Sequence, residues 1–178
     1  MRIVSGNLKG IRFKAPKGFP SRPTTDFAKE ALFNILANNY FFDEIAVLDL
    51  FSGTGSISYE FASRGVKQVT AIDKNYKCVS FIQKKIKELK LEHLRVLKSD
   101  AIQFLNKNEE TFDLIFADPP FSLAIHEEIV NLIFEKDLLI EEGVLIIEHG
   151  RETNLKSIPQ YIETKNYGGV QFSFFKKK

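Results

Sequence analysis

The sequence has almost none of the residues that form covalent cross-links or metal sites. Its 178 residues include one cysteine, Cys78, which excludes an internal disulfide, and three scattered histidines, which lack the spacing of metal ligands. No apolar run approaches the roughly 18–20 residues that a membrane helix needs, and no long apolar segment follows the N-terminal charge as in a signal peptide. We therefore expect a cytoplasmic globular protein outside any membrane, without a bound metal, and with Cys78 as a small core residue.

Acidic residues are absent from the N-terminal segment, although the net charge of the whole chain is only +2. Residues 1–25 contain six basic side chains and no acidic one, whereas residues 109–152 contain twelve acidic and two basic side chains. The basic end suits a polyanion, and the acidic stretch suits a solvated surface. Basic N-termini are common, so this feature alone leaves nucleic-acid binding undecided.

The N-terminal segment has the pattern of a small appendage. Apolar segments on either side of the turn-prone residues 5–7 predict a short hairpin. A Pro- and Gly-rich stretch then leads to a helix that Thr24 or Thr25 could cap. We therefore divide the chain into a basic hairpin extension, residues 1–23, and a main domain, residues 24–178.

From residue 45 onward, apolar runs of strand length alternate with helical patterns. Strands that are apolar at nearly every position predict a parallel sheet covered by helices on both faces. Because the connections between parallel strands are right-handed, the expected fold is a doubly wound α/β domain. In such sheets ligands bind beyond the carboxyl ends of the strands. The expected strands are residues 46–50, 68–72, 94–97, 112–116 and 143–148, followed by a closing hairpin of residues 161–164 and 171–175.

The residues after the first three expected strands favour a nucleoside ligand. Gly53 and Gly55 let the backbone turn tightly and approach a ligand, although Ser58 stands where a dinucleotide fingerprint has its third glycine. Asp73 follows the second strand, where a carboxylate can accept both ribose hydroxyls. Asp100 follows the third strand and could accept an amino proton from adenine. Each of these features alone could instead be an ordinary turn or a helix cap.

The fourth expected strand ends in Asp118-Pro119-Pro120-Phe121. Prolines lack the backbone N–H that a sheet needs, so the strand cannot continue there. The exocyclic amine of a nucleobase is a poor nucleophile, because its lone pair is delocalised into the ring. A carboxylate and a fixed backbone carbonyl can each accept one N–H and aim that lone pair at an electrophile, while an aromatic ring stacks on the base. This stretch therefore favours chemistry on a base amine over hydride transfer.

These motifs resemble those of the S-adenosylmethionine-dependent amino-methyltransferases, and more narrowly the RsmD-type methyltransferases of small-subunit ribosomal RNA. The resemblance implies a Rossmann-like sheet of seven strands, mostly parallel and with the last one antiparallel. It also implies methylation of the N2 amine of one guanine in 16S rRNA, at the family's position 966. The motifs that carry it are Asp118–Phe121, residues 49–55, residues 2–6 with Gly10, residues 22–26 and 30–34, and the Tyr167-Gly168-Gly169 turn.

The same resemblance implies roles for individual residues, with in-line transfer of a sulfonium methyl and no strong general base. It also implies that Glu148 is the acidic residue after the fifth strand, and it assigns nothing to residues 149–160. The implied catalytic residues are Asp118, Pro119, Pro120 and Phe121. The implied contacts to S-adenosyl-L-methionine are Asp49, Phe51, Gly53, Thr54, Gly55, Asp73 and Asp100. The expected RNA contacts are Arg2, Lys9, Arg12, Lys14, Arg22 and Thr24, of which the last two could instead be structural.

Three other functions remain open from the sequence. A DNA amino-methyltransferase would share the motif but usually carries a separate recognition domain, for which 178 residues leave no room. An NAD-dependent oxidoreductase is disfavoured by Ser58, and a non-catalytic RNA-binding module by the intact Asp118–Phe121 motif. We expect a monomer that acts on 16S rRNA, and the sequence leaves open whether its substrate is naked rRNA, the small ribosomal subunit or an assembly intermediate.

Overall fold

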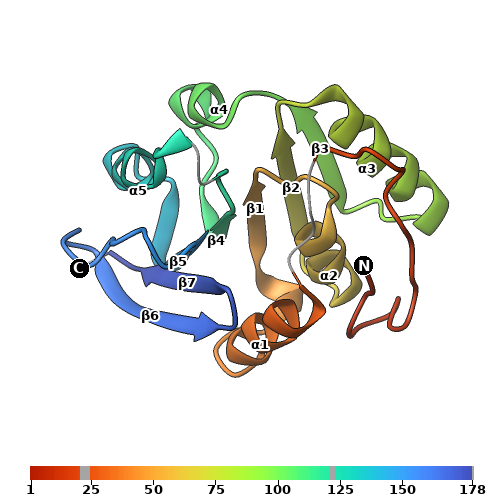
Figure 1. The fold of residues 1–178 in the computed structure, drawn as a ribbon, viewed down its shortest axis with the longest axis horizontal. Helices are drawn as coiled ribbons and strands as arrows, with labels where there is room; N and C mark the ends of the chain where they lie inside the picture. Colours follow the sequence, from red (N-terminus) through yellow and green to blue (C-terminus); the bar gives the residue numbers. More distant parts are fainter. Residues whose placement is uncertain (21–24, 121–122, 178) are drawn as a thin grey trace.

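A computed structural model of the chain describes residues 1–20, 25–120 and 123–177. The predicted site residues Arg22, Thr24 and Phe121 lie outside the described residues. A seven-stranded sheet with the order β3-β2-β1-β4-β5-β7-β6 forms the centre of the described structure (Figure 1). The strands are β1 Ala46–Leu50, β2 Gln68–Asp73, β3 Leu94–Lys98, β4 Phe112–Ala117, β5 Leu139–His149, β6 Tyr161–Tyr167 and β7 Val170–Phe175.

The first five strands are parallel, and β7 runs antiparallel to both of its neighbours, β5 and β6. The predicted fold class, a mostly parallel sheet whose last strand is antiparallel, is therefore confirmed. Helices join the parallel strands in the alternating order that the sequence predicted. They are α2 Ser56–Ser63, α3 Tyr76–Leu89, α4 Ala101–Lys107 and α5 His126–Glu135, whereas α1 Asp26–Ala37 and a short 3-10 helix η1, Phe42–Glu44, precede β1.

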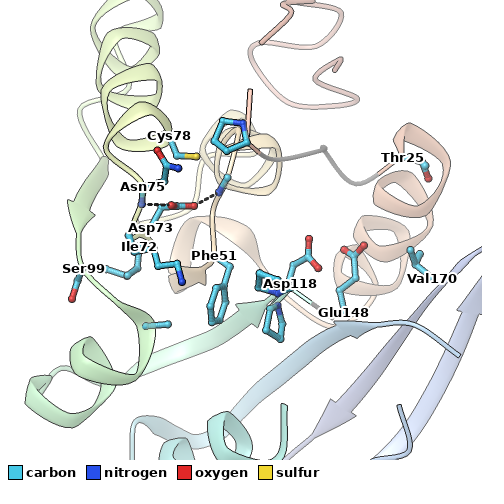
Figure 2. Close-up of a pocket in the computed structure, with 16 residues that line it drawn as sticks. Thr25, Phe51, Ile72, Asp73, Asn75, Cys78, Ser99, Asp118, Glu148 and Val170 are labelled. Atoms are coloured by element: carbon cyan, nitrogen blue, oxygen red, sulfur yellow. Dashed lines mark hydrogen bonds between the residues drawn. The ribbon is translucent and has the colours of Figure 1, made fainter. Parts of the chain in front are cut away.

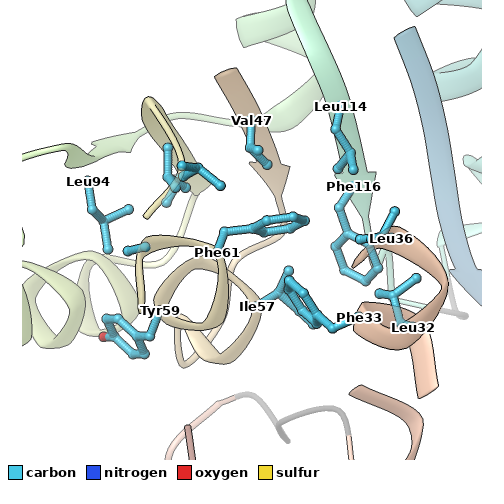
Figure 3. Close-up of a cluster of buried hydrophobic side chains, with 14 of the residues drawn as sticks. Leu32, Phe33, Leu36, Val47, Ile57, Tyr59, Phe61, Leu94, Leu114 and Phe116 are labelled. Carbon is cyan, nitrogen blue, oxygen red and sulfur yellow. The ribbon is translucent and has the colours of Figure 1, made fainter. Parts of the chain in front are cut away.

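Two apolar cores cover the two faces of the sheet. Because side chains alternate along a strand, Leu114 and Phe116 of β4 enter one core, and Ile115 and Ala117 enter the other. Helices α1, α2 and α3 close the first core (Figure 3), and α4 and α5 close the second. Burial on both faces explains why the strands read as nearly continuous apolar runs. Within the residues that the structure describes, no helix has both the length and the apolar character to cross a bilayer.

The sheet register brings the strand ends together at one edge. Leu50 of β1 pairs with Ile72 of β2 on one side and with Ala117 of β4 on the other, and Ala117 pairs in turn with Ile147 of β5. The chain order of the strands reverses between β1 and β4, which is where sheets of this type open a crevice. The residues that follow these strands are therefore neighbours around that crevice.

The predicted N-terminal hairpin is reduced to one antiparallel bridge between Arg2 and Arg12. Backbone hydrogen bonds from Ile3 N to Ile11 O at 3.0 Å and from Phe13 N to Met1 O at 3.3 Å flank this bridge, and Gly10 N donates to Ile3 O at 2.9 Å. Further pairing is replaced by docking on α2, since Asn7 N donates to the Ser63 carbonyl at 2.7 Å. The extension is therefore held by helix α2 more than by its own strands.

A buried charge network fastens this segment. Glu60 of α2 is 0% exposed and accepts hydrogen bonds from the amides of Val4, at 2.7 Å, and Ser5, at 3.0 Å. The Lys29 ammonium lies 3.9 Å from Glu60 and donates to the Arg2 carbonyl at 2.5 Å. Burial lowers the pKa of Lys29, and the neighbouring Glu60 carboxylate opposes that shift. Glu60 also pairs with Arg64 at 3.0 Å, so α1 and α2 hold the N-terminal segment through a network of charges.

We predict that Glu60→Gln destabilises the protein strongly. Removing one partner of a buried ion pair leaves the other charge uncompensated and costs about 3–5 kcal/mol. The matched control is Glu88→Gln, because Glu88 pairs with Lys84 and Lys85 on the exposed face of α3, where such pairs contribute about 0–1 kcal/mol. Urea unfolding measures both variants, and equal losses of unfolding free energy would contradict the role given to Glu60.

Candidate active site

A cleft of about 520 Å³ opens at the carboxyl ends of the parallel strands (Figure 2). Its size lies within the range of roughly 300–1,000 Å³ that is usual for small-molecule sites. The predicted residues Phe51, Gly53, Asp73, Asp118, Pro119 and Pro120 line it. The other lining residues are Pro20, Thr25, Ile72, Lys74, Asn75, Cys78, Ser99, Ala101, Glu148 and Val170.

The turn after β1 is fixed by hydrogen bonds to the end of β2. The Gly53 amide donates to one Asp73 carboxylate oxygen at 2.8 Å, and the Asn75 amide donates to the other at 2.7 Å (Figure 2). The Ser52 hydroxyl donates to the Asp49 and Ile72 carbonyls at 2.8 and 3.0 Å. Asp73 therefore joins the two strand ends while facing the cleft, and its position agrees with the one that the sequence predicted.

Gly55 is required by the packing beneath this turn. Its φ angle is +78°, and a Cβ atom would lie 2.7 Å from the ring of Tyr59. Any side chain at this position would clash with Tyr59 and would also be strained. Gly55 and the adjacent Thr54 lie behind the turn and not at the cleft surface. Their predicted contact with a ligand stays a prediction, and what the structure supports is that they shape the turn.

Asp49 also lies behind the cleft. It is 1% exposed, and its carboxylate accepts a hydrogen bond from the Ser58 hydroxyl. Burial raises the pKa of Asp49 to about 7, the Ser58 hydrogen bond opposes this, and the nearby carboxylates of Asp118 and Asp73 add to it. The Ser58 hydroxyl therefore serves as a hydrogen-bond donor to Asp49, at the position where a dinucleotide fingerprint has its third glycine. Asp49 does not line the cleft, and its predicted cofactor contact stays a prediction.

Asp100 caps helix α4. One of its carboxylate oxygens accepts hydrogen bonds from the amides of Ile102, at 3.0 Å, and Gln103, at 3.2 Å. This is the helix-cap role that the sequence also allowed. Its neighbours Ser99 and Ala101, which the sequence did not single out, line the cleft in its place. A ligand contact of Asp100 stays a prediction.

The Asp118-Pro119-Pro120 stretch follows β4 directly. The Asp118 amide donates to the Leu50 carbonyl of β1 at 3.4 Å, and then the prolines leave the sheet. Burial raises the pKa of Asp118 to about 7. Glu148 lies near the end of the neighbouring strand β5, is 4% exposed, and its carboxylate points into the cleft beside that of Asp118 (Figure 2). Two carboxylates from adjacent strands therefore face the same space.

The cleft is dominated by negative charge. Asp73, Asp118 and Glu148 line it, and among its described lining residues Lys74 is the one basic side chain. Such a surface attracts a cationic ligand. Cys78 faces the same space, and burial raises its thiol pKa to about 12. Among the residues with described positions, no group of three or more His, Cys, Asp or Glu side chains is placed to hold a metal ion.

The basic N-terminal side chains differ in their surroundings. Lys9, Arg12 and Lys14 are exposed. Arg2 lies 3.8 Å from the carboxylates of both Asp26 and Glu30, so its charge is partly offset within the chain. Exposure therefore supports an RNA contact for Lys9, Arg12 and Lys14 better than it does for Arg2.

Comparison with known proteins covers the whole length of the chain. The family described as "Conserved hypothetical protein 95" matches residues 1–176. The Bacillus subtilis protein named "Putative rRNA methyltransferase YlbH" is 35% identical, with 100% of both chains covered. "Ribosomal RNA small subunit methyltransferase D" of Escherichia coli strain K12 is 31% identical, over 89% of this chain and 79% of that protein.

Solved structures agree with this assignment. The Escherichia coli structure described as "Putative methyltransferase yhhF" superposes with a TM-score of 0.87 at 27% identity, covering 100% of this chain and 99% of that one. The Haemophilus influenzae methylase HI0767, likewise described as putative, gives a TM-score of 0.80 at 26% identity, covering 98% and 96% of the two chains. The resemblance drawn from the motifs is confirmed, and the chain belongs to the RsmD-type methyltransferase family that carries the description "Conserved hypothetical protein 95".

Proposed function

We propose that this protein transfers a methyl group from S-adenosyl-L-methionine to the exocyclic N2 amine of a guanine in 16S rRNA. The observation that carries the proposal is the composition of the cleft. It holds Asp118-Pro119-Pro120 on one side and Asp73 with the Gly53 turn on the other, and three carboxylates surround the space between. The curated relatives named as rRNA methyltransferases support the choice of RNA as substrate.

The Asp73 side of the cleft fits the nucleoside part of the cofactor. Each Asp73 oxygen accepts one backbone amide, and a carboxylate oxygen has a second lone pair for a ribose hydroxyl. Phe51 and Ile72 provide apolar wall, and Ser99 lies where β3 ends. When bound, the cofactor supplies an electrophilic methyl group on a sulfonium cation. The excess of carboxylates favours this cation over a neutral or anionic ligand.

The Asp118 side orients the acceptor. The Asp118 carboxylate and the Pro119 carbonyl each accept one N–H of the guanine amine, which aims the nitrogen lone pair at the methyl carbon. Bound S-adenosyl-L-methionine would supply the methyl group and leave as S-adenosylhomocysteine, and the methylated amine would release one proton to solvent. The fixed φ of the prolines keeps the carbonyl in place. Proximity and orientation of this kind can lower a barrier by about 7–11 kcal/mol.

The target guanine must be unpaired or flipped out. In a duplex the neighbouring bases block an in-line approach to the amine. Phe121 follows the prolines and would stack on the base. The sequence assigns this role, and Phe121 itself lies outside the described residues.

Residues 1–23 would serve as an RNA-contacting extension of the domain formed by residues 24–178. We further infer a cytoplasmic monomer that acts on 16S rRNA within the small subunit or an assembly intermediate, at the family's guanine 966.

A methyl-transfer assay tests this function. Radiolabelled S-adenosyl-L-methionine would be incubated with the protein and with naked 16S rRNA, small ribosomal subunits or DNA. We expect label on rRNA, either free or within subunits, and none on DNA. Label on DNA alone would support the rival DNA methyltransferase, and absence of label on every substrate would contradict an enzymatic role.

We predict that Asp118→Ala lowers the rate of methyl transfer by about 100-fold or more, because the amine loses its orientation. Asp118→Asn should retain intermediate activity, since an amide oxygen still accepts one N–H. The control is Asp137→Asn, which removes the same charge at an exposed site paired with Lys177. Near-normal turnover by Asp118→Ala would place the chemistry elsewhere.

The raised pKa of Asp118 also predicts a pH profile. Because that pKa is about 7, the carboxyl group is mainly protonated below pH 7 and then accepts hydrogen bonds poorly. The kcat/KM of the wild type should therefore fall as the pH drops through about 7. The profile of the Asp118→Asn variant should be flat over the same range. A bound cation favours the charged form, so the kcat profile should lie at lower pH than the kcat/KM profile.

We predict that neutralising Lys9, Arg12 and Lys14 makes RNA binding less salt-dependent. Each lost phosphate contact reduces the slope of log affinity against log salt by about 0.7–0.9. The control neutralises Lys77, Lys84 and Lys87, which are exposed on α3. Fluorescence anisotropy at several salt concentrations measures the slopes. Equal slopes for the two triple variants would favour a purely solubilising role for the basic segment.

A further inference from the structure

An aromatic pair, with one exposed ring and one half-buried ring, lies close in sequence to two residues that line the cleft. Phe27, in the first turn of α1, is 67% exposed, and its ring lies 6.3 Å from that of Tyr167 at an interplanar angle of 69°. Phe27 comes two residues after Thr25, and Tyr167 comes three residues before Val170. Thr25 and Val170 both line the cleft and lie on the side of Glu148 and away from Asp73 (Figure 2). The pair is therefore next to the half of the cleft that we assign to the methyl acceptor.

The pair is anchored to the core through a row of rings. Tyr167 lies 5.9 Å from the ring of Phe172, which is 0% exposed, and Phe172 lies 6.3 Å from the ring of Phe116. Phe116 is in β4, two residues before Asp118. Aromatic contacts of this kind fix the geometry of each ring. The exposed ring of Phe27 thus contacts a ring that is itself packed against the core.

The charges around the pair are compatible with a polyanion. Asp26 and Glu30 lie on either side of Phe27 in the sequence, and Arg2 lies 3.8 Å from both carboxylates and offsets their charge. On the other side, the exposed Arg151 donates a hydrogen bond to the Gly168 carbonyl at 3.1 Å, next to Tyr167. A phosphate at this rim would meet the Arg151 guanidinium, and Arg2 offsets part of the charge of Asp26 and Glu30.

We propose that Phe27 and Tyr167 form a stacking platform for an unpaired nucleobase adjacent to the target nucleotide. This inference rests on the proposed function, because extrusion of one base leaves the neighbouring base without a stacking partner. Single-stranded RNA is recognised largely by stacking of such bases on aromatic rings. The platform stands beside the acceptor half of the cleft, where that neighbouring base would emerge.

Binding of a short unstructured RNA oligonucleotide, measured by fluorescence anisotropy, tests the platform. Loss of one stacking partner weakens binding by about 5- to 150-fold, which we expect for Phe27→Ala. Phe27→Trp should bind like the wild type, because it keeps an aromatic face. Phe27→Leu should be as weak as Phe27→Ala, because it keeps only apolar volume. The control Phe41→Ala removes a ring that is 79% exposed before η1, at the opposite edge of the sheet, and should bind normally.

Wild-type affinity in Phe27→Ala would overturn the platform, and so would a wild-type protein that does not bind the oligonucleotide. Wild-type affinity in Phe27→Leu would also overturn it, because an apolar contact without stacking fits a protein partner. The measurement reads binding and not methyl transfer. A protein that binds the oligonucleotide through Phe27 but transfers no methyl group to rRNA would contradict the proposed function and leave the platform standing.

Discussion

Four carboxylates meet at one edge of an otherwise apolar sheet, and this concentration of like charge constrains the rest of the site. Asp73, Asp118 and Glu148 line the cleft, and Asp49 lies buried behind it. Burial raises the pKa of Asp49 and of Asp118 to about 7, above the ordinary value of 3.8. These folded-state values exceed those of the unfolded chain, so folding favours the protonated groups. Their contribution to stability is complete below about pH 3.8 and is lost as the pH rises through about 7. A cationic ligand would offset this cost at neutral pH, which connects the electrostatics of the cleft to its proposed use.

Helix α2 connects the cofactor turn to the N-terminal segment. Tyr59 lies beneath Gly55, and its ring makes an edge contact with Phe13 at 5.1 Å. The next residue, Glu60, holds the amides of Val4 and Ser5. The two halves of the proposed reaction, cofactor binding and RNA binding, therefore share one short helix.

The parts of the fold and site that the sequence predicted are those determined by local patterns. Strands buried on both faces must be apolar throughout, so residues 112–116 were predicted as a strand, which ends one residue later at Ala117. The position of Asp118 at the strand end followed from that prediction. The prediction was weaker where a side chain's direction decided the outcome. Asp49 is 1% exposed and Asp100 caps α4, and neither of them lines the cleft, so their cofactor contacts stay predictions. Lys29 and Glu60 could not be paired from the sequence, because each reads as an ordinary helix charge and their contact depends on how α1 packs on α2.

The central claim is that the cleft presents a guanine amine to a sulfonium methyl group. Nucleoside analysis of 16S rRNA after incubation with the protein and S-adenosyl-L-methionine tests it most directly, by mass spectrometry of the digested RNA. The account predicts N2-methylguanosine with the wild-type protein and almost none with Asp118→Ala. A methyl group on an adenine or cytosine amine, or on a ribose hydroxyl, would contradict the account.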